Sequence, residues 1–161
     1  GHLVFSTLHT NDTASSVSRL LDLGIEPFLL ASVLTGIVAQ RLMRKVCSEC
    51  AAEQFLTDEQ IVALGIPVEP GEKRKLPVKK GQGCVRCRNT GLYGRTGIFE
   101  MLDVSTKIRR MVMEGKDSKE IGKVAQLDGM TPLRQAAIRK LAQGLTTYEE
   151  VFRVTADADA L

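Results

Sequence analysis

The chain of 161 residues is long enough for one well-buried domain, or for one domain with a small appendage. Its net charge of +3 is too small to indicate nucleic-acid binding by itself, and its 43% apolar content is typical of a globular protein. No run of about 18 uncharged apolar residues occurs, so the sequence predicts no membrane-spanning helix. The first residues lack the basic region and cleavage site of a signal peptide, and we therefore expect a cytoplasmic protein.

The opening of the chain predicts a strand, a loop and two helices. Residues 3–8 are apolar and partly β-branched, as in a short buried strand, and the polar residues 9–13 are typical of a loop that caps a helix. We expect the first helix to end at Gly24. The second helix is expected to begin at Pro27, a residue favoured in the first helical turn, and to carry a broad apolar face as far as Leu42.

All four cysteines of the chain fall in two pairs, and each pair has a two-residue gap: Cys47 with Cys50, and Cys84 with Cys87. Two thiolates at this spacing can reach one ion, so two pairs supply the four ligands of a tetrahedral zinc site. Four protein sulfurs leave no open position for water, which predicts a structural rather than a catalytic metal. Because the spacer of residues 51–83 is longer than the usual ~15 to 20 residues, disulfides and buried thiols are alternatives.

The spacer between the cysteine pairs predicts one short helix and otherwise extended or looped chain. Thr57 and Gln60 have the spacing of a capping box, which starts a helix reaching about Leu64. Prolines then predict the absence of further helix in the spacer. These prolines are Pro67, Pro70 and Pro77.

After the last cysteine, residues 97–104 predict a strand that leaves the metal site, and the rest of the chain predicts helices. Candidate helix N-caps are Ser105, Asp117 or Ser118, Thr131 and Thr147. Candidate helix stops are Gly115, Gly129 and Gly144.

The two histidines, His2 and His9, flank the first predicted strand. Their spacing would place them on opposite faces of a strand, so they are not an obvious metal pair. His9 is the better candidate for contact with a ligand, because α/β sheets place such side chains at strand ends, although a purely structural histidine is the competing interpretation. For Arg41, a favourable interaction with the predicted helix dipole is a sufficient explanation. No glycine-rich phosphate loop ending in Gly-Lys-Ser or Gly-Lys-Thr occurs.

Several stretches together resemble the type II secretion and type IV pilus assembly ATPases. Residues 1–12 resemble the histidine box of that family, residues 40–50 and 83–100 its arginine and tetracysteine region, and residues 129–131 its C-terminal end. The resemblance covers nearly the whole chain. It is closest to the general secretory pathway protein E and pilus extension ATPase branches, and less close to the retraction ATPase, which lacks the cysteines.

The resemblance implies an α/β fold, namely the C-terminal part of a RecA-like P-loop ATPase domain with an inserted tetracysteine zinc module and a C-terminal helical bundle. Residues 1–46 would contain a strand and helices of the ATPase core, residues 47–100 the zinc module and residues 101–161 the helical segment. The family forms homo-hexameric motors that use ATP and Mg²⁺ and act on an inner-membrane platform protein. The resemblance implies neither insertion into the membrane nor binding of nucleic acid.

In that family the Walker A loop, the acidic box and the Walker B glutamate precede the histidine box, so we expect a C-terminal fragment that does not hydrolyse ATP alone. The resemblance places His9 near the γ-phosphate of the nucleotide and His2 in the same box, with Thr7 and Arg41 as weaker candidates for nucleotide sensing. A histidine there can form a hydrogen bond to the phosphate, and an arginine can neutralise its charge.

Two functions of other classes stay open at this point: a free-standing adaptor that is held by zinc and only binds proteins, and a zinc-ribbon nucleic-acid binder. Basic residues in the spacer favour the second, whereas a 4% aromatic content provides few rings for base stacking. These basic residues are Lys73, Arg74, Lys75, Lys79 and Lys80.

Overall fold

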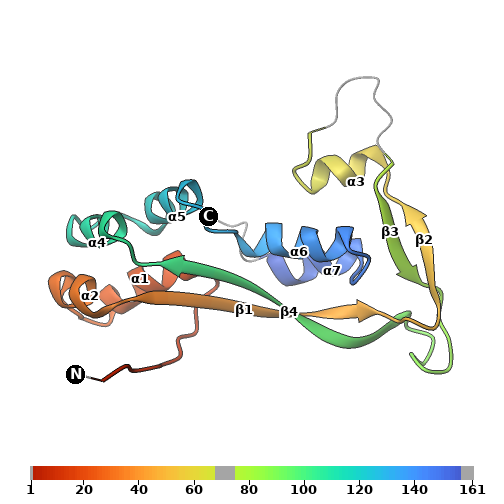
Figure 1. Ribbon diagram of the computed structural model, residues 1–161, viewed down its shortest axis with the longest axis horizontal. Helices are drawn as coiled ribbons and strands as arrows, with labels where there is room; N and C mark the ends of the chain where they lie inside the picture. The colour runs from red at the N-terminus through yellow and green to blue at the C-terminus, as the bar shows by residue number, and fades with distance from the viewer. Residues whose placement is uncertain (1, 68–74, 157–161) are drawn as a thin grey trace. The chain divides into compact units, whose positions relative to one another are not determined.

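The computed structural model describes residues 2–67 and 75–156, and Figure 1 shows its elements in chain order. The elements are α1 (Thr13–Asp22), α2 (Pro27–Val33), β1 (Gly36–Val46), β2 (Ala51–Phe55), α3 (Asp58–Ala63), β3 (Pro77–Gly81), β4 (Leu92–Asp103), α4 (Thr106–Met113), α5 (Ser118–Leu127), α6 (Leu133–Ala142) and α7 (Tyr148–Thr155). Strand β1 pairs with β4, and β2 pairs with β3. No helix in these two ranges is long and apolar enough to cross a membrane.

The described residues form two compact units. The first contains residues 2–40 and 99–133, and the second contains residues 41–67, 75–98 and 134–156. Each unit therefore holds part of β1 and part of β4. This division by compactness differs from the segments 1–46, 47–100 and 101–161 that the family resemblance implies.

The core of the first unit forms where α1 packs against α5 and α2 packs against α4. Asp12 is the N-cap of helix α1, and its side chain accepts a hydrogen bond of 2.7 Å from the Ser15 amide, as the sequence predicts for the polar loop. The buried members of this core are Ala14, Val17, Leu30, Ala31, Leu102, Val104, Ile108, Val112, Ile121 and Ala125.

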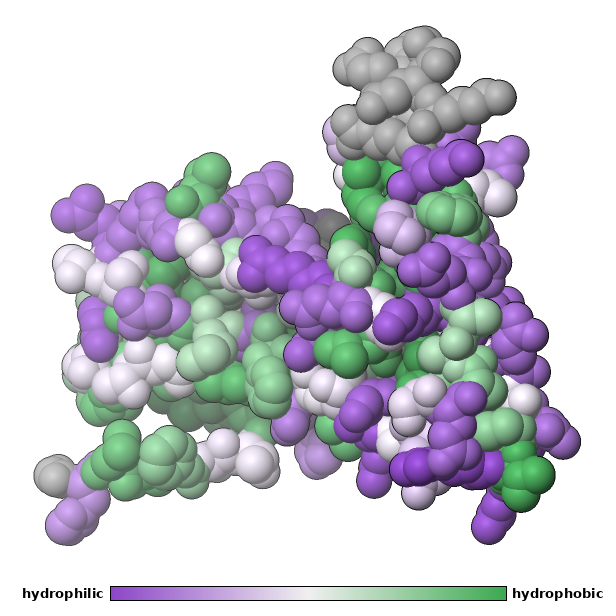
Figure 2. Space-filling view, turned by 45° about the vertical axis from the view of Figure 1, so that its right-hand side comes forward, coloured by the Kyte–Doolittle hydropathy of each residue, from purple (hydrophilic) through white to green (hydrophobic). Residues whose placement is uncertain are grey.

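Residues 3–8 do not form the predicted strand; they belong to an irregular segment, residues 2–10, in which the side chains of residues 2–9 are exposed. The exposed fractions of Leu3, Val4 and Phe5 are 75%, 78% and 88%, and this apolar segment is visible at the lower left of Figure 2. A strand requires a neighbouring strand to satisfy its backbone N–H and C=O groups. In the described part of the chain neither sheet includes these residues, so the backbone has no strand partner there.

The single helix predicted from Pro27 to Leu42 is wrong in its second half. Helix α2 ends at Val33, and strand β1 begins at Gly36. Glycine is a poor helix former and the β-branched residues that follow it favour a strand. Side chains along the first part of β1 then alternate between exposed and partly buried, which is the period of a strand. Arg41 consequently lies in a strand, and its helix-dipole explanation no longer applies.

The second unit contains the spacer between the cysteine pairs. Strands β2 and β3 pair in antiparallel fashion from Ala51 opposite Gly81 to Phe55 opposite Pro77, a ladder that the sequence did not reveal. Between them, the capping box at Thr57 is confirmed and starts α3. Pro77 is the first residue of β3, where a missing N–H is tolerated, and Pro70 lies outside the described residues.

The expectation of helices after residue 104 is confirmed by α4 to α7. Ser105, Asp117 and Thr147 are N-caps, and each side chain accepts a hydrogen bond from the third residue after it. Helix α6 begins at Leu133, two residues beyond the predicted cap Thr131. The predicted stops all have positive φ angles, a conformation that glycine adopts without strain: Gly115 (68°), Gly129 (105°) and Gly144 (67°).

Candidate metal centre and its surroundings

The four cysteines meet in the second unit, where their sulfur atoms all lie within 4.8 Å of one another. The Sγ–Sγ distances are 3.8 Å for Cys47 and Cys84, 3.8 Å for Cys50 and Cys87, and 3.7 Å for Cys84 and Cys87. Sulfurs at about 2.3 Å from one tetrahedral zinc ion would be about 3.8 Å apart, so the arrangement fits such an ion. All four are free thiols, at distances far beyond the ~2.05 Å of a disulfide bond.

Backbone N–H groups also point at the sulfur atoms. Gly83 donates to Cys50 Sγ at 3.3 Å, and Cys84 and Gly91 donate to Cys87 Sγ at 3.2 Å and 3.3 Å. Burial raises the pKa of Cys87, but the two N–H donors, together with hydrogen bonds from the Cys84 and Cys50 side chains, outweigh burial and lower it to about 6. At Cys50, burial is the largest cause of a pKa raised to about 11. Donors of this kind stabilise thiolate ligands and fix their direction.

Gly81 and Gly91 allow the loop that follows the second cysteine pair to pass the end of β3 with the two backbones in direct contact. A Cβ atom at Gly81 would lie 2.6 Å from the carbonyl carbon of Gly91, closer than any side chain can approach. The Gly91 carbonyl accepts a hydrogen bond of 2.9 Å from the Cys47 amide, and Gly91 has a φ of 72°. The crossing therefore holds the second cysteine pair against the first.

The outer side of the cysteine cluster displays side chains rather than enclosing a cavity. Val85, which lies between two of the cysteines, is 94% exposed. Next to it, Arg86 donates a 2.6 Å hydrogen bond to Glu49 and stacks over the Tyr93 ring, 4.7 Å from its centroid. Four sulfur ligands would leave a metal no open position, so the arrangement suits a structural rather than a catalytic ion.

The basic residues of the spacer have separate environments. Lys80 Nζ lies 3.4 Å from Glu149 Oε1, and Lys75 Nζ lies 5.8 Å from the centroid of the Phe55 ring. The side chain of Lys79 passes the backbone of Gly144. Lys73 and Arg74 lie outside the described residues.

The predicted nucleotide-sensing residues lie in both units. His2, Thr7 and His9 are exposed in the segment before α1, which belongs to the first unit. Arg41 is half-buried in the part of β1 that belongs to the second unit. The structure therefore gives the three N-terminal residues a common segment, but it does not assign Arg41 to the same site.

Glu100 is a buried carboxylate at the end of the stretch 83–100 that resembles the tetracysteine region of the family. It is 5% exposed and accepts hydrogen bonds from the backbone N–H and hydroxyl of Thr13, at 2.9 Å and 2.6 Å, and from the Leu133 N–H at 3.1 Å. These donors are the first residues of α1 and α6. One sequence signal could have indicated this contact: Glu100 is an acidic residue at an inward-facing position of an otherwise apolar stretch of β4. A carboxylate buried at such a position needs hydrogen-bond donors around it.

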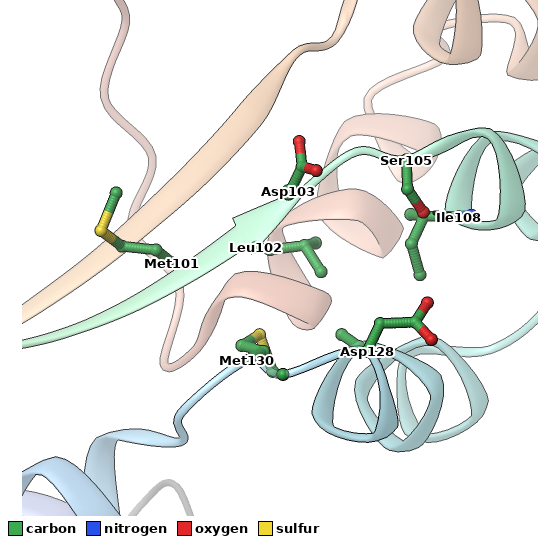
Figure 3. Close-up of a pocket in the computed structure, with 9 residues that line it drawn as sticks. Met101, Leu102, Asp103, Ser105, Ile108, Asp128 and Met130 are labelled. Atoms are coloured by element: carbon green, nitrogen blue, oxygen red, sulfur yellow. Dashed lines mark hydrogen bonds between the residues drawn. The ribbon is translucent and has the colours of Figure 1, made fainter.

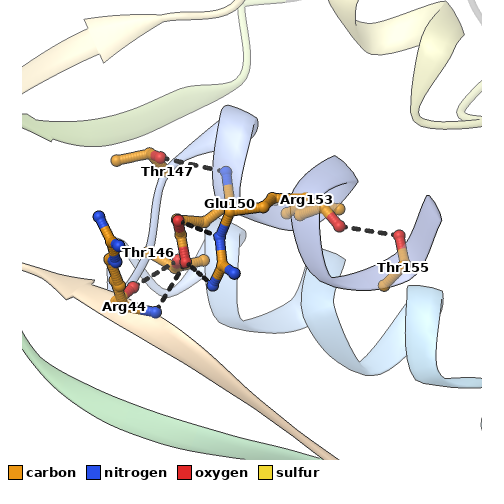
Figure 4. Close-up of polar contacts among 7 residues, drawn as sticks. Arg44, Thr146, Thr147, Glu150, Arg153 and Thr155 are labelled. Atoms are coloured by element: carbon orange, nitrogen blue, oxygen red, sulfur yellow. Dashed lines mark hydrogen bonds and ion pairs between the residues drawn. The ribbon is translucent and has the colours of Figure 1, made fainter.

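A second buried carboxylate, that of Glu150 in α7, forms a hydrogen bond with the backbone of β1 (Figure 4). Its Oε2 accepts a 2.8 Å hydrogen bond from the Arg44 amide, and its two oxygens accept 2.6 Å and 2.7 Å bonds from the Arg153 guanidinium. The Thr146 hydroxyl donates to the Arg44 carbonyl at 2.8 Å. Side chains thus satisfy both backbone groups of Arg44, as a neighbouring strand would.

Replacing Glu150 by glutamine should lower stability in a pH-dependent way. Burial raises the pKa of Glu150, but the Arg153 and Arg44 donors outweigh it and hold the pKa below its ordinary value of 4.5. A depressed pKa stabilises the fold above pH 4.5, and this stabilisation is lost as the pH falls through the folded-state pKa. We expect Glu150→Gln to cost about 1–2 kcal/mol at pH 7, limited by the half-exposed Arg153.

Urea unfolding of wild type and variant at pH 7 and pH 3 measures this effect, with the exposed Glu53→Gln as the matched control. The difference between wild type and Glu150→Gln should shrink at pH 3, and Glu53→Gln should differ little from wild type at either pH. An equal difference at both pH values would contradict the assigned charge interaction.

A pocket of about 220 Å³ opens in the first unit between the end of β4 and the turn after α5. Figure 3 shows Asp103 and Ser105 on one side of it and Asp128 and Met130 on the other. Two carboxylates at an apolar pocket would suit a cationic side chain. Lys107 of the same chain already fills part of this role, because its Nζ lies 3.1 Å from Asp128 Oδ1.

Comparison with known proteins gives consistent results. The family model for the type II/IV secretion system protein matches residues 1–153. The type II secretion system protein HxcR of Pseudomonas aeruginosa is 42% identical over 98% of this chain and 29% of its own length. The type IV pilus assembly ATPase PilB of Thermus thermophilus is 42% identical over 96% of this chain and 17% of its own length. The chain thus spans less than a third of these relatives.

A crystal structure of the pilus retraction motor PilT with bound ADP has a similar fold, with a TM-score of 0.60 at 23% sequence identity. The likeness covers 100% of this chain and 34% of that protein. It shows an α/β fold of the kind found in that motor, whereas the family is shown by the match along nearly the whole sequence. The chain is therefore a member of the type II/IV secretion system protein family.

Proposed function

We propose that this chain is the C-terminal part of a homo-hexameric motor ATPase that powers type II protein secretion or type IV pilus assembly. The family match over residues 1–153 carries the proposal, and the likeness to PilT supports a motor fold. In the parent motor, residues 1–46 belong to the RecA-like core, residues 47–100 form the zinc module, and residues 101–161 form the helical bundle. The motor is cytoplasmic, uses ATP and Mg²⁺, and reaches the inner membrane through a platform protein.

The zinc module has a structural role in this proposal. Cys47, Cys50, Cys84 and Cys87 would hold one Zn²⁺, since their sulfur atoms lie within 4.8 Å of one another and three of the Sγ–Sγ distances are 3.7–3.8 Å. A bound zinc ion would fix the two loops that carry the cysteine pairs. The chain's own contribution is the set of N–H donors to the sulfurs and the close crossing of two glycines.

The histidine segment would sense the nucleotide. His9 can donate a hydrogen bond to a phosphate oxygen, with His2 and Thr7 in the same exposed segment and Arg41 as a further candidate. The chain contains no loop ending in Gly-Lys-Ser or Gly-Lys-Thr. The catalytic lysine and glutamate would therefore come from another part of the parent motor.

The outer surface of the zinc module would face the platform protein. A closed metal site provides no chemistry, whereas the exposed Val85 provides an apolar contact and the basic residues of the spacer provide a salt-sensitive one. Reversing the charges of Lys75 and Lys79 in the parent motor should weaken platform binding and leave basal ATP hydrolysis intact.

ATP should not bind this chain appreciably, and a thermal melt tests this. In RecA-like sites most phosphate contacts come from the loop amides, the loop lysine and a bound magnesium. A complete site with micromolar affinity would stabilise the fold by about 4 kcal/mol at millimolar ATP, a shift of several degrees. We expect no shift for the isolated chain with ATP and Mg²⁺. A clear rise that His9→Ala abolishes would show a complete nucleotide site within this chain and overturn the proposal.

A further inference from the structure

We propose that Glu100 is the positioning residue of the histidine loop, defined as residues 9–12, and that it ties this loop to helix α6. The inference rests on the proposed nucleotide-sensing function of His9. It starts from the buried carboxylate of Glu100, which lies outside the cysteine cluster and accepts hydrogen bonds from Thr13 and Leu133.

The histidine loop is fixed at its C-terminal end. Asp12 is 5% exposed and accepts from both the amide and the hydroxyl of Ser15, each at 2.7 Å. The Thr10 and Ser16 hydroxyls lie 2.6 Å apart, and the Ser16 hydroxyl also donates to the Asp12 carbonyl at 3.1 Å. Thr10 and Asp12, which follow His9 in the chain, are therefore held against the first turn of α1.

Glu100 sets the position of that turn. Its Oε1 accepts both the N–H and the hydroxyl of Thr13, the first residue of α1, which is fully buried. Two helix N-termini face the same carboxylate, where their free N–H groups and dipoles stabilise a negative charge. Because β4 carries Glu100 and also leaves the second cysteine pair, the strand is a direct covalent link from the zinc module to this anchor.

The two oxygens of Glu100 serve different elements. Oε1 holds α1 and Oε2 holds the N–H of Leu133, the first residue of α6. A shift of His9 on nucleotide binding would therefore be transmitted to the start of α6 through the Glu100 side chain. Bonds of this length in a dry site are directional, and misplacing a phosphate-contacting group by about 1 Å costs up to ~100-fold in rate.

Two substitutions separate the two bonds. Thr13→Val removes the hydroxyl but keeps the shape and the backbone N–H. Glu100→Gln can keep its oxygen on Thr13, but it then places an NH₂ group against the Leu133 N–H. The exposed Glu114→Gln is the matched control for loss of a carboxylate.

The test is a double-mutant cycle in the full-length parent motor, with steady-state kcat and KM for ATP as the readout. We expect His9→Ala and Thr13→Val each to lower kcat, the second by about tenfold, and the double variant to be no slower than His9→Ala alone. Glu100→Gln should lower kcat by about threefold or more, and Glu114→Gln should match wild type. Each variant's melting temperature is measured in parallel, so that unfolded variants are recognised.

The outcomes distinguish this inference from the function on which it rests. If His9→Ala lowers kcat but Thr13→Val does so by the same factor with and without His9, then Glu100 only supports the fold and the inference is overturned. If His9→Ala leaves both kcat and KM for ATP unchanged, the proposed nucleotide sensing is overturned as well. If a variant fails to fold in the motor, amide hydrogen exchange of residues 9–12 in the Thr13→Val chain decides, since unchanged protection there contradicts positioning by Glu100.

Discussion

Stripping the metal from zinc-loaded protein is expected to unfold residues 47–97 and to leave the first unit folded. Zinc binding at four-cysteine sites has apparent free energies of about 10–16 kcal/mol, which is largely folding energy. Among the described residues, none from 41 to 98 is a buried member of the apolar core of the first unit, so we expect its helices α1, α2, α4 and α5 to remain folded without the metal. We expect metal analysis to return one zinc per chain before treatment.

Amide hydrogen exchange before and after chelation measures the extent of unfolding, and added zinc should restore it. Cys50→Ser should behave like the chelated protein, whereas Ser48→Ala, an exposed neighbour in the same loop, should retain the metal and the fold. Protein with four reduced thiols and no zinc would contradict the metal assignment. Loss of protection throughout the first unit would instead show that the two units unfold together.

Local sequence signals predicted the parts of the structure that short-range chemistry determines. The capping box at Thr57 and the cap at Asp117 depend on side chains three residues away from the amides that they satisfy. The clustering of the cysteines also follows from ligand spacing, although only the structure shows that their sulfurs lie within 4.8 Å.

Signals that depend on distant neighbours misled the prediction. The apolar residues after Pro27 suit a helix and a strand equally, and the pairing of β1 with β4, more than 40 positions along the chain, decides for the strand after Gly36. Residues 3–8 have the composition of a strand but no described partner. Glu100 could not be recognised as an anchor, because its donors at Thr13 and Leu133 are far away in sequence.

Alanine at Gly81 or Gly91 is expected to destabilise the second unit far more than alanine at Gly94, although Gly91 and Gly94 share a positive φ. Gly94 has a φ of 76° and open space around its Cα, so Gly94→Ala costs only the backbone penalty of about 1–2 kcal/mol. Gly81→Ala has no such penalty, but its Cβ would lie 2.6 Å from backbone atoms of Gly91. Backbone cannot rotate away as a side chain can, so we expect a cost of at least ~3 kcal/mol.

Gly91→Ala combines both effects, since its φ is 72° and its Cβ would lie 2.9 Å from the Gly81 carbonyl carbon. The expected order of stability in urea is therefore wild type, Gly94→Ala, Gly81→Ala and Gly91→Ala. The crossing also holds the Cys47 amide through the Gly91 carbonyl, so the last two variants should bind zinc more weakly and Gly94→Ala should not. If Gly94→Ala were as damaging as Gly81→Ala, backbone conformation rather than the close crossing would control the assembly of the metal centre.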